Sequence, residues 1–182
     1  MIKKILFVLF FAGGISVLSA QPVTLSVGGS IGLGQIKGNT PSLTAFEGSI
    51  FIDAAPSFFD DFSLRLGYMY EQKVEYFLPE NRTGKYYPSL RAFSLKAVLS
   101  QSISYNVYLE EGLGAIMLND RTLIEDSKWN AGAGFHALIG LDLRDGESKG
   151  FRLGVGTDYG IAFTDANASY SNIYIQVQYY FL

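Results

Sequence analysis

Residues 151–163 read Phe-Arg-Leu-Gly-Val-Gly-Thr-Asp-Tyr-Gly-Ile-Ala-Phe, and their large apolar residues fall on alternate positions. From Phe151 to Phe163 every second residue except Thr157 is apolar, and the residues between them are Arg, Asp, Gly or Ala. A helix would spread these apolar residues around its axis, and each internal glycine would cost about 1 kcal/mol relative to alanine. The stretch therefore predicts a β-strand with one apolar face and one face of small and charged residues.

The same alternation recurs in seven further stretches, several of which approach the roughly 9–11 residues that a tilted strand needs to cross a bilayer. No stretch after the N-terminus has about 18 consecutive apolar residues, so α-helical spans are not expected. With 182 residues the chain favours a single domain, and we predict an all-β fold of eight antiparallel strands. The seven further stretches are 23–35, 45–54, 62–71, 91–100, 106–117, 129–143 and 172–182.

The composition excludes several functional classes. The chain has no cysteine and one histidine, His136, which excludes thiol chemistry, disulfides and multi-histidine metal sites. Its net charge of −3 provides no basic surface for nucleic acid. Charged residues make up 17% of the chain, against roughly 25% in soluble domains, which is not typical of a cytosolic enzyme.

The N-terminus has the three parts of a secretory signal peptide. Residues 1–4 are positively charged, residues 5–18 are mostly apolar, and Ser19-Ala20 offers small residues for cleavage. The apolar run is shorter than the about 20 residues of a membrane anchor. We therefore expect residues 1–20 to be removed and residues 21–182 to form one domain, a β-barrel.

Two kinds of barrel fit this alternation. In a soluble, lipocalin-like barrel the apolar face points inward and the other face meets water. Here the face opposite the apolar one consists mostly of Gly, Ser and isolated charges. Glycine weakens a strand and has no clear use on a surface that meets water. In a transmembrane barrel the same glycines make room for a few long polar side chains in a narrow lumen, so we favour the transmembrane arrangement.

The spacing of the strands predicts short connections at one end of the barrel and longer ones at the other. Both chain termini of an even-stranded barrel lie on the periplasmic side, where the turns are short. Connections at 55–61, 101–105 and 144–150 would be periplasmic. Those at 36–44, 72–90, 118–128 and 164–171 would be external.

Together with the signal peptide and the eight stretches, the ending Tyr174-Ile-Gln-Val-Gln-Tyr-Tyr-Phe-Leu182 resembles small bacterial outer-membrane barrels of the OmpA-transmembrane-domain, OmpX and OmpW type. The resemblance is one of pattern over the whole mature chain. It implies residence in outer-membrane lipid and recognition of the last strand by the barrel-assembly machinery. Phe181 is here penultimate, whereas such proteins end in an aromatic residue. We expect a monomer with no cofactor and no metal.

The polar face carries charges of both signs, which would pair in a narrow lumen because a buried charge without a partner is costly. We predict Arg65, Lys96 and Arg152 as the cationic centres and Glu47, Glu110 and Asp158 as their partners, although the pairing itself is open. The predicted luminal network is Glu47, Arg65, Lys96, Glu110, His136, Arg152 and Asp158.

Three functions follow from this network. A filled lumen favours a non-enzymatic surface protein that acts through membrane integrity or loop contacts, as the OmpA-like resemblance implies. The alternative is a narrow channel for ions or small hydrophobic solutes, as the OmpW-like resemblance implies. A lipid-modifying enzyme with His136 as general base is third, because His136 lies on the luminal parity and no serine is close to it in the sequence.

Overall fold

The computed structural model describes most of the predicted barrel domain. The predicted signal peptide, residues 1–20, lies outside the described residues. Residue 128 is described by its backbone only. The described ranges are 23–38, 41–57, 61–78, 80, 86–122, 127–144, 149–163 and 168–181.

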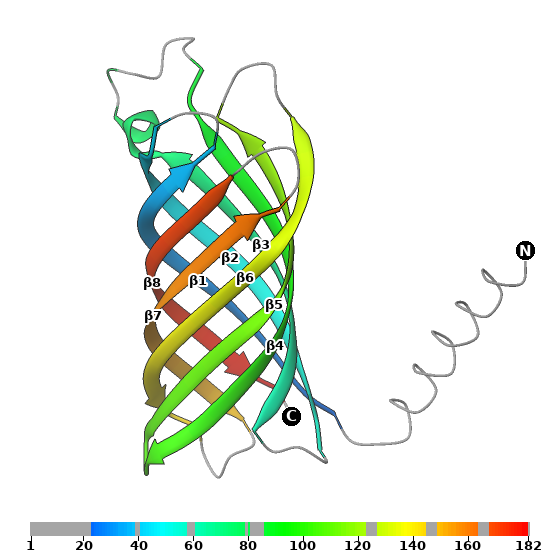
Figure 1. The fold of residues 1–182 in the computed structure, drawn as a ribbon. Coiled ribbons are helices and arrows are strands. Elements are labelled where there is room, and N and C mark those ends of the chain that lie inside the picture. Colours follow the sequence, from blue (N-terminus) through cyan, green and yellow to red (C-terminus); the bar gives the residue numbers. More distant parts are fainter. Residues whose placement is uncertain are drawn as a thin grey trace, which may run out of the picture.

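Eight strands form one closed barrel in which each strand pairs with its neighbours in the sequence, and this confirms the predicted fold (Figure 1). Pairs Ser26↔Tyr180 to Lys37↔Ser169 join the first strand to the last in antiparallel register. A closed sheet leaves no unpaired edge, which allows strands to cross hydrocarbon. In the described part of the chain, no helix is long and apolar enough to cross a membrane. The elements are β1 (Val23–Lys37), β2 (Leu43–Pro56), β3 (Phe62–Lys73), the 3₁₀ helix η1 (Val74–Phe77), β4 (Ser89–Ser104), β5 (Val107–Arg121), β6 (Lys128–Asp142), β7 (Gly150–Ala162) and β8 (Ser169–Tyr180).

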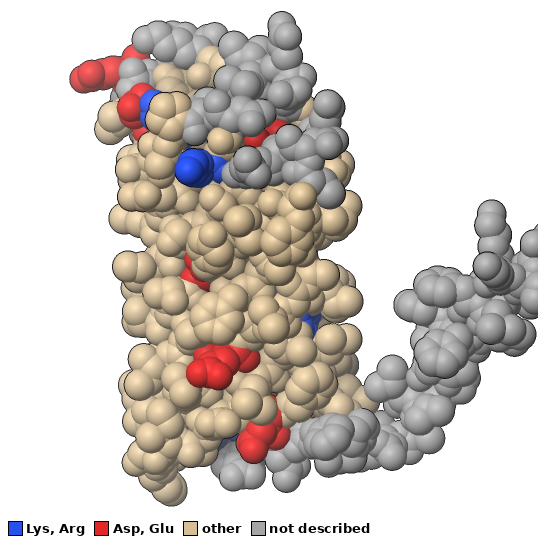
Figure 2. Space-filling view, viewed as in Figure 1, with Lys and Arg blue, Asp and Glu red and all other residues tan. Residues whose placement is uncertain are grey.

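The barrel is apolar outside and mostly polar inside. Ile50 and Ile173 on its outer face are each 66% exposed, whereas the inward-facing Gln178 is completely buried. Figure 2 shows the resulting surface, on which a broad uncharged wall is interrupted at few places by acidic side chains. One charged side chain on the outer face is Glu111 of β5, which pairs with Leu99 and Ala137 and is exposed. The inverted distribution is that of a barrel whose outer face meets lipid.

The two ends of the barrel differ. We call the end at which β1 begins and β8 ends the proximal end, and the opposite end the distal end (Figure 1). The distal end carries η1 and the connection that follows it, as the predicted loop pattern requires. The predicted proximal connection 101–105 is wrong, because β4 runs on to Ser104 and turns into β5 through residues 105–106 only. Residues 101–104 lack large alternating apolar side chains apart from Ile103, so their pattern did not indicate a strand.

A buried apolar cluster fills the distal part of the lumen, which corrects the prediction of a lumen that is polar throughout. Ile36, Leu90 and Leu118 are each completely buried in it. All three fall in segments predicted as external connections, whereas β1, β4 and β5 extend far enough to bring them inside the barrel. We call the following residues the distal apolar cluster: Ile36, Ala45, Met69, Leu90, Ala92, Ile116, Leu118, Ala162, Ala168 and Tyr170.

Candidate functional site: the filled lumen

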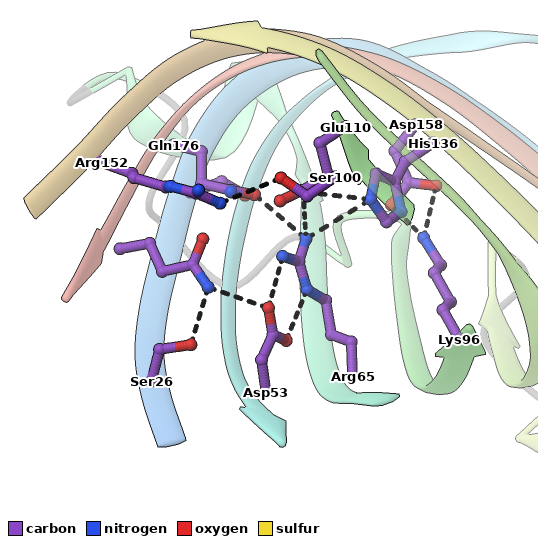
Figure 3. Close-up of polar contacts among 12 residues, drawn as sticks. Ser26, Asp53, Arg65, Lys96, Ser100, Glu110, His136, Arg152, Asp158 and Gln176 are labelled. Carbon is purple, nitrogen blue, oxygen red and sulfur yellow. Dashed lines mark hydrogen bonds and ion pairs between the residues drawn. The ribbon is translucent and has the colours of Figure 1, made fainter. Parts of the chain in front are cut away.

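Arg65 of β3 organises the middle of the lumen. Its Nε and one terminal nitrogen donate to the two carboxylate oxygens of Asp53, each at 2.7 Å, and its other terminal nitrogen donates to Glu110 at 2.8 Å. His136 Nε2 lies 3.2 Å from the same Glu110 oxygen (Figure 3). All four side chains are at most 5% exposed. We call Asp53, Arg65, Glu110 and His136 the central ion cluster.

Small and flat neighbours make space for this cluster. A Cβ at Gly112 would lie 2.1 Å from the His136 ring, so the imidazole occupies the space that any larger residue at position 112 would fill. The guanidinium of Arg65 also lies over the ring of Phe51, 4.0 Å from its centroid. The luminal glycines therefore allow these long side chains to lie across a narrow barrel, as the sequence predicted.

A second ion pair spans the lumen next to the central ion cluster. Lys96 Nζ of β4 donates to both oxygens of Asp158 of β7, at 2.9 and 2.7 Å (Figure 3). These strands lie on opposite sides of the barrel, so the pair reaches across its interior. Tyr170 donates a further hydrogen bond to Asp158 at 3.3 Å. The pair therefore connects the central ion cluster to the distal apolar cluster.

A third group closes the lumen toward the proximal end. Arg152 and Arg144 both bind Asp142, with shortest nitrogen–oxygen distances of 2.8 and 2.7 Å. Arg152 also donates to Ser100 Oγ of β4 and to Tyr180 OH of β8, each at 3.0 Å. This group joins β4, β6, β7 and β8 across the barrel, so it restricts entry into the lumen from the proximal end.

The structure places all seven predicted network residues inside the barrel, and it gives the pairing that the prediction left open. Glu47 was predicted as a partner of a cation, yet it accepts a hydrogen bond from Ser30 at 3.0 Å and forms no ion pair with a described side chain. The acid that binds Arg152 is Asp142, which was not among the predicted partners. Arg65, Lys96, Glu110, Arg152 and Asp158 take part in the ion pairs described above, and His136 contacts Glu110 at hydrogen-bond distance.

Sequence reasoning missed several residues of this network. Phe51 lies on the luminal parity of β2 but was not considered, because a large apolar side chain was expected to face lipid. Gln178 Nε2 donates to Asp53 at 2.9 Å and to Ser26 Oγ at 2.7 Å. The parity of the last strand does place Gln178 inside, so this signal was present in the sequence.

The lumen holds little free space. A cavity of about 40 Å³ lies between Arg65, Lys96 and Tyr174, which is room for very few water molecules. A larger space of about 860 Å³ lies at the proximal mouth, beside Ser100, Arg152 and Tyr180. The wide space is therefore a vestibule at one end, and the ion pairs and the distal apolar cluster fill the region beyond it.

The chemistry of the site is that of a closed polar core. His136 contacts Glu110 and Arg65 and lies 2% exposed inside the barrel, where a lipid substrate on the outer face cannot meet it. In the residues that the structure describes, no group of three or more His, Cys, Asp or Glu side chains is arranged to hold a metal ion.

Comparison with solved structures agrees with this architecture. Neisserial surface protein A matches with a TM-score of 0.66 at 13% sequence identity, covering 88% of this chain and 100% of that one. Ail, the attachment invasion locus protein of Yersinia pestis, in complex with the heparin analogue sucrose octasulfate, matches with a TM-score of 0.54 at 12% identity, covering 87% of this chain and 97% of that one. No protein-family model and no curated protein matches the sequence. At these identities the likeness shows the fold, which is that of a small bacterial outer-membrane β-barrel, and this fold with its apolar outer face indicates the bacterial outer membrane as its location.

Proposed function

We propose that residues 21–182 form a monomeric, non-conducting barrel of the outer membrane, which acts through membrane integrity and through contacts of its distal loops. The observation that carries this proposal is the filling of the lumen at successive levels. Arg152, Arg65 and Lys96 each bind acidic partners inside the barrel, and beyond them lies the distal apolar cluster. An ion that crosses would have to break buried ion pairs and then enter an apolar region, and both steps are costly.

The same features support a non-enzymatic role. The one histidine of the chain is engaged by Glu110 and Arg65 inside the barrel, so it is not placed to act on a lipid. We also propose that the chain is inserted by the barrel-assembly machinery through β8, whose outward residues Ile173, Ile175 and Val177 are exposed.

Single-channel conductance in a planar bilayer tests the proposal. The refolded protein, with folding confirmed by its β-sheet circular dichroism, should produce no discrete conductance steps. Two variants serve as controls for an absence of conductance in the unmodified protein. Arg65→Ala alone should stay silent because the Lys96–Asp158 pair and the distal apolar cluster still close the lumen, whereas Arg65→Ala combined with Lys96→Ala, Leu90→Gly and Leu118→Gly should conduct. Regular steps from the unmodified protein would refute the proposal and favour the narrow channel.

A further inference from the structure

Two carboxylates in the lumen, Glu47 and Glu71, form no ion pair with any described side chain. The register places them directly opposite each other on β2 and β3, and they are 3% and 0% exposed. Residues at directly opposed positions have Cβ atoms about 4.5–5.5 Å apart. Two ionised carboxylates this close repel each other when water is scarce, so the pair requires a bound cation or a shared proton.

Each of these carboxylates has one oxygen that is satisfied and one that is not. Glu47 Oε1 accepts a hydrogen bond from Ser30 at 3.0 Å, and Glu71 Oε1 accepts one from Asn172 Nδ2 at 2.7 Å. The second oxygens, Glu47 Oε2 and Glu71 Oε2, are buried and have no hydrogen-bond partner. Leaving a charged acceptor buried and unsatisfied is costly, so these oxygens point to a missing ligand.

Asn172 of β8 supplies an independent third oxygen. The residue is 2% exposed, and its Oδ1 is also buried without a partner. Two of these oxygens lie against glycines of β1. A Cβ at Gly34 would be 1.8 Å from Asn172 Oδ1, and a Cβ at Gly32 would be 3.0 Å from Glu47 Oε2. The two glycines lie two residues apart on one face of β1, so they leave room on that face for an oxygen from β2 and an oxygen from β8.

The local charge is also unbalanced. Asp158 and Lys96 are the further charged groups of the described lumen that act on Glu47 and Glu71, so three negative charges minus one positive charge leave −2. The carboxylates are Glu47, Glu71 and Asp158, and the ammonium is that of Lys96. One divalent cation would neutralise this charge.

We propose that Glu47, Glu71 and Asn172 form a buried oxygen site for one divalent hard cation of the Ca²⁺ class. Carboxylate and amide oxygens are the ligands that such cations prefer. One cation accepts several oxygen ligands, whereas one proton shared by the two carboxylates would bridge two oxygens only. The remaining ligands of such a cation would be waters, and the nearest cavity, of about 40 Å³, is lined by Ser30 and Ser49, of which Ser30 donates a hydrogen bond to Glu47.

The first experiment measures metal binding by the unmodified protein. Protein unfolded in EDTA is refolded in detergent with Ca²⁺, desalted and analysed for metal content, and a parallel sample is titrated with Tb³⁺. Terbium emission excited through tyrosine reports a close site, since Tyr174 lies beside Gly32, as Glu47 does. We expect one ion per chain and displacement of Tb³⁺ by Ca²⁺. A folded protein that binds no ion overturns the proposal, and it would indicate that the carboxylates share a proton instead.

The second experiment assigns the ligands. Glu71→Gln keeps the size of the side chain and should weaken Ca²⁺ binding at least about tenfold. Glu47→Gln should do the same, and Ca²⁺ should no longer raise the unfolding temperature of the double variant. The matched control is Glu75→Gln, because Glu75 lies in η1 and pairs with Lys73 at the surface. Unchanged Ca²⁺ binding by a folded double variant would overturn the assignment of the site. If the double variant does not fold, the metal content of the unmodified protein still decides whether a cation is bound.

Discussion

The substitution Arg65→Ala tests the energetic role of the central ion cluster most directly. Arg65 is 5% exposed and makes three hydrogen bonds of 2.7 to 2.8 Å to two carboxylates. Its removal leaves Asp53 and Glu110 buried without their main countercharge. Breaking a buried ion pair on one side costs about 3–5 kcal/mol, because an uncompensated charge remains. We therefore expect the free energy of unfolding to fall by about this amount, which changes the ratio of folded to unfolded protein by a factor of 100 or more.

The assay is equilibrium unfolding by urea in lipid vesicles, followed through the fluorescence of Trp129. This is the one tryptophan of the chain, and its side chain is 48% exposed on the outer face, so its emission should change when it leaves the bilayer. The midpoint and the slope are measured for both proteins, because a changed slope would mean that more than stability has changed.

A compensated variant provides the control. Asp53→Asn, Arg65→Met and Glu110→Gln together remove the charges and keep similar side-chain volumes. Replacement of a whole buried ion cluster is often neutral, so this triple variant should regain most of the lost stability. The reasoning is refuted if Arg65→Ala costs less than about 1 kcal/mol, or if the triple variant is less stable than the single one.

Three further predictions concern the two faces of the barrel. Val155→Arg should lower the free energy of unfolding in vesicles by about 2–4 kcal/mol if Val155, 52% exposed on the outer face, lies at mid-bilayer, and a near-neutral result would contradict the inside-out arrangement. Glu111→Leu should instead stabilise the protein by about 1–2 kcal/mol, since a carboxylate on the same face is replaced by an apolar group; a loss of stability in the same unfolding assay would show that the carboxylate has a partner. Leu118→Ala should cost about 2–5 kcal/mol, because Leu118 is completely buried in the distal apolar cluster, and a cost typical of an exposed loop residue would show that the cluster is not packed.

The agreement between pattern and structure follows from the geometry of a strand. Successive side chains point to opposite faces, so the alternation in residues 151–163 fixed which residues of β7 face lipid and which face the lumen. The same rule places Arg65, Lys96 and His136 inside, because each lies on the face that carries glycine and serine. A sequence with this alternation in eight stretches therefore specifies the fold class and the charged residues that line the lumen without any knowledge of tertiary contacts.

The ends of the strands were harder to predict for a different reason. The alternation of large apolar and small residues persists only where one face meets lipid. Toward their ends the strands continue with residues that break this alternation, as in residues 101–104 of β4 and at Leu118 of β5, which is apolar but faces the lumen. Leu90 and Leu118 were therefore expected in loops, and the distal apolar cluster was not anticipated.

The pairing inside the lumen was decided by the tertiary structure alone. Alternation determines whether a side chain points into or out of the barrel. Strand tilt and the closure of β1 on β8 determine which inward side chains meet each other. Lys96 and Asp158 are 62 residues apart and meet because β4 and β7 face each other at that height. Glu47 and Glu71 are brought together by the register of β2 and β3, and no cation of the described chain reaches them. The sequence by itself determined a barrel with charges inside it, and the register and closure of the sheet decided which charges are paired and which two are left to bind a ligand.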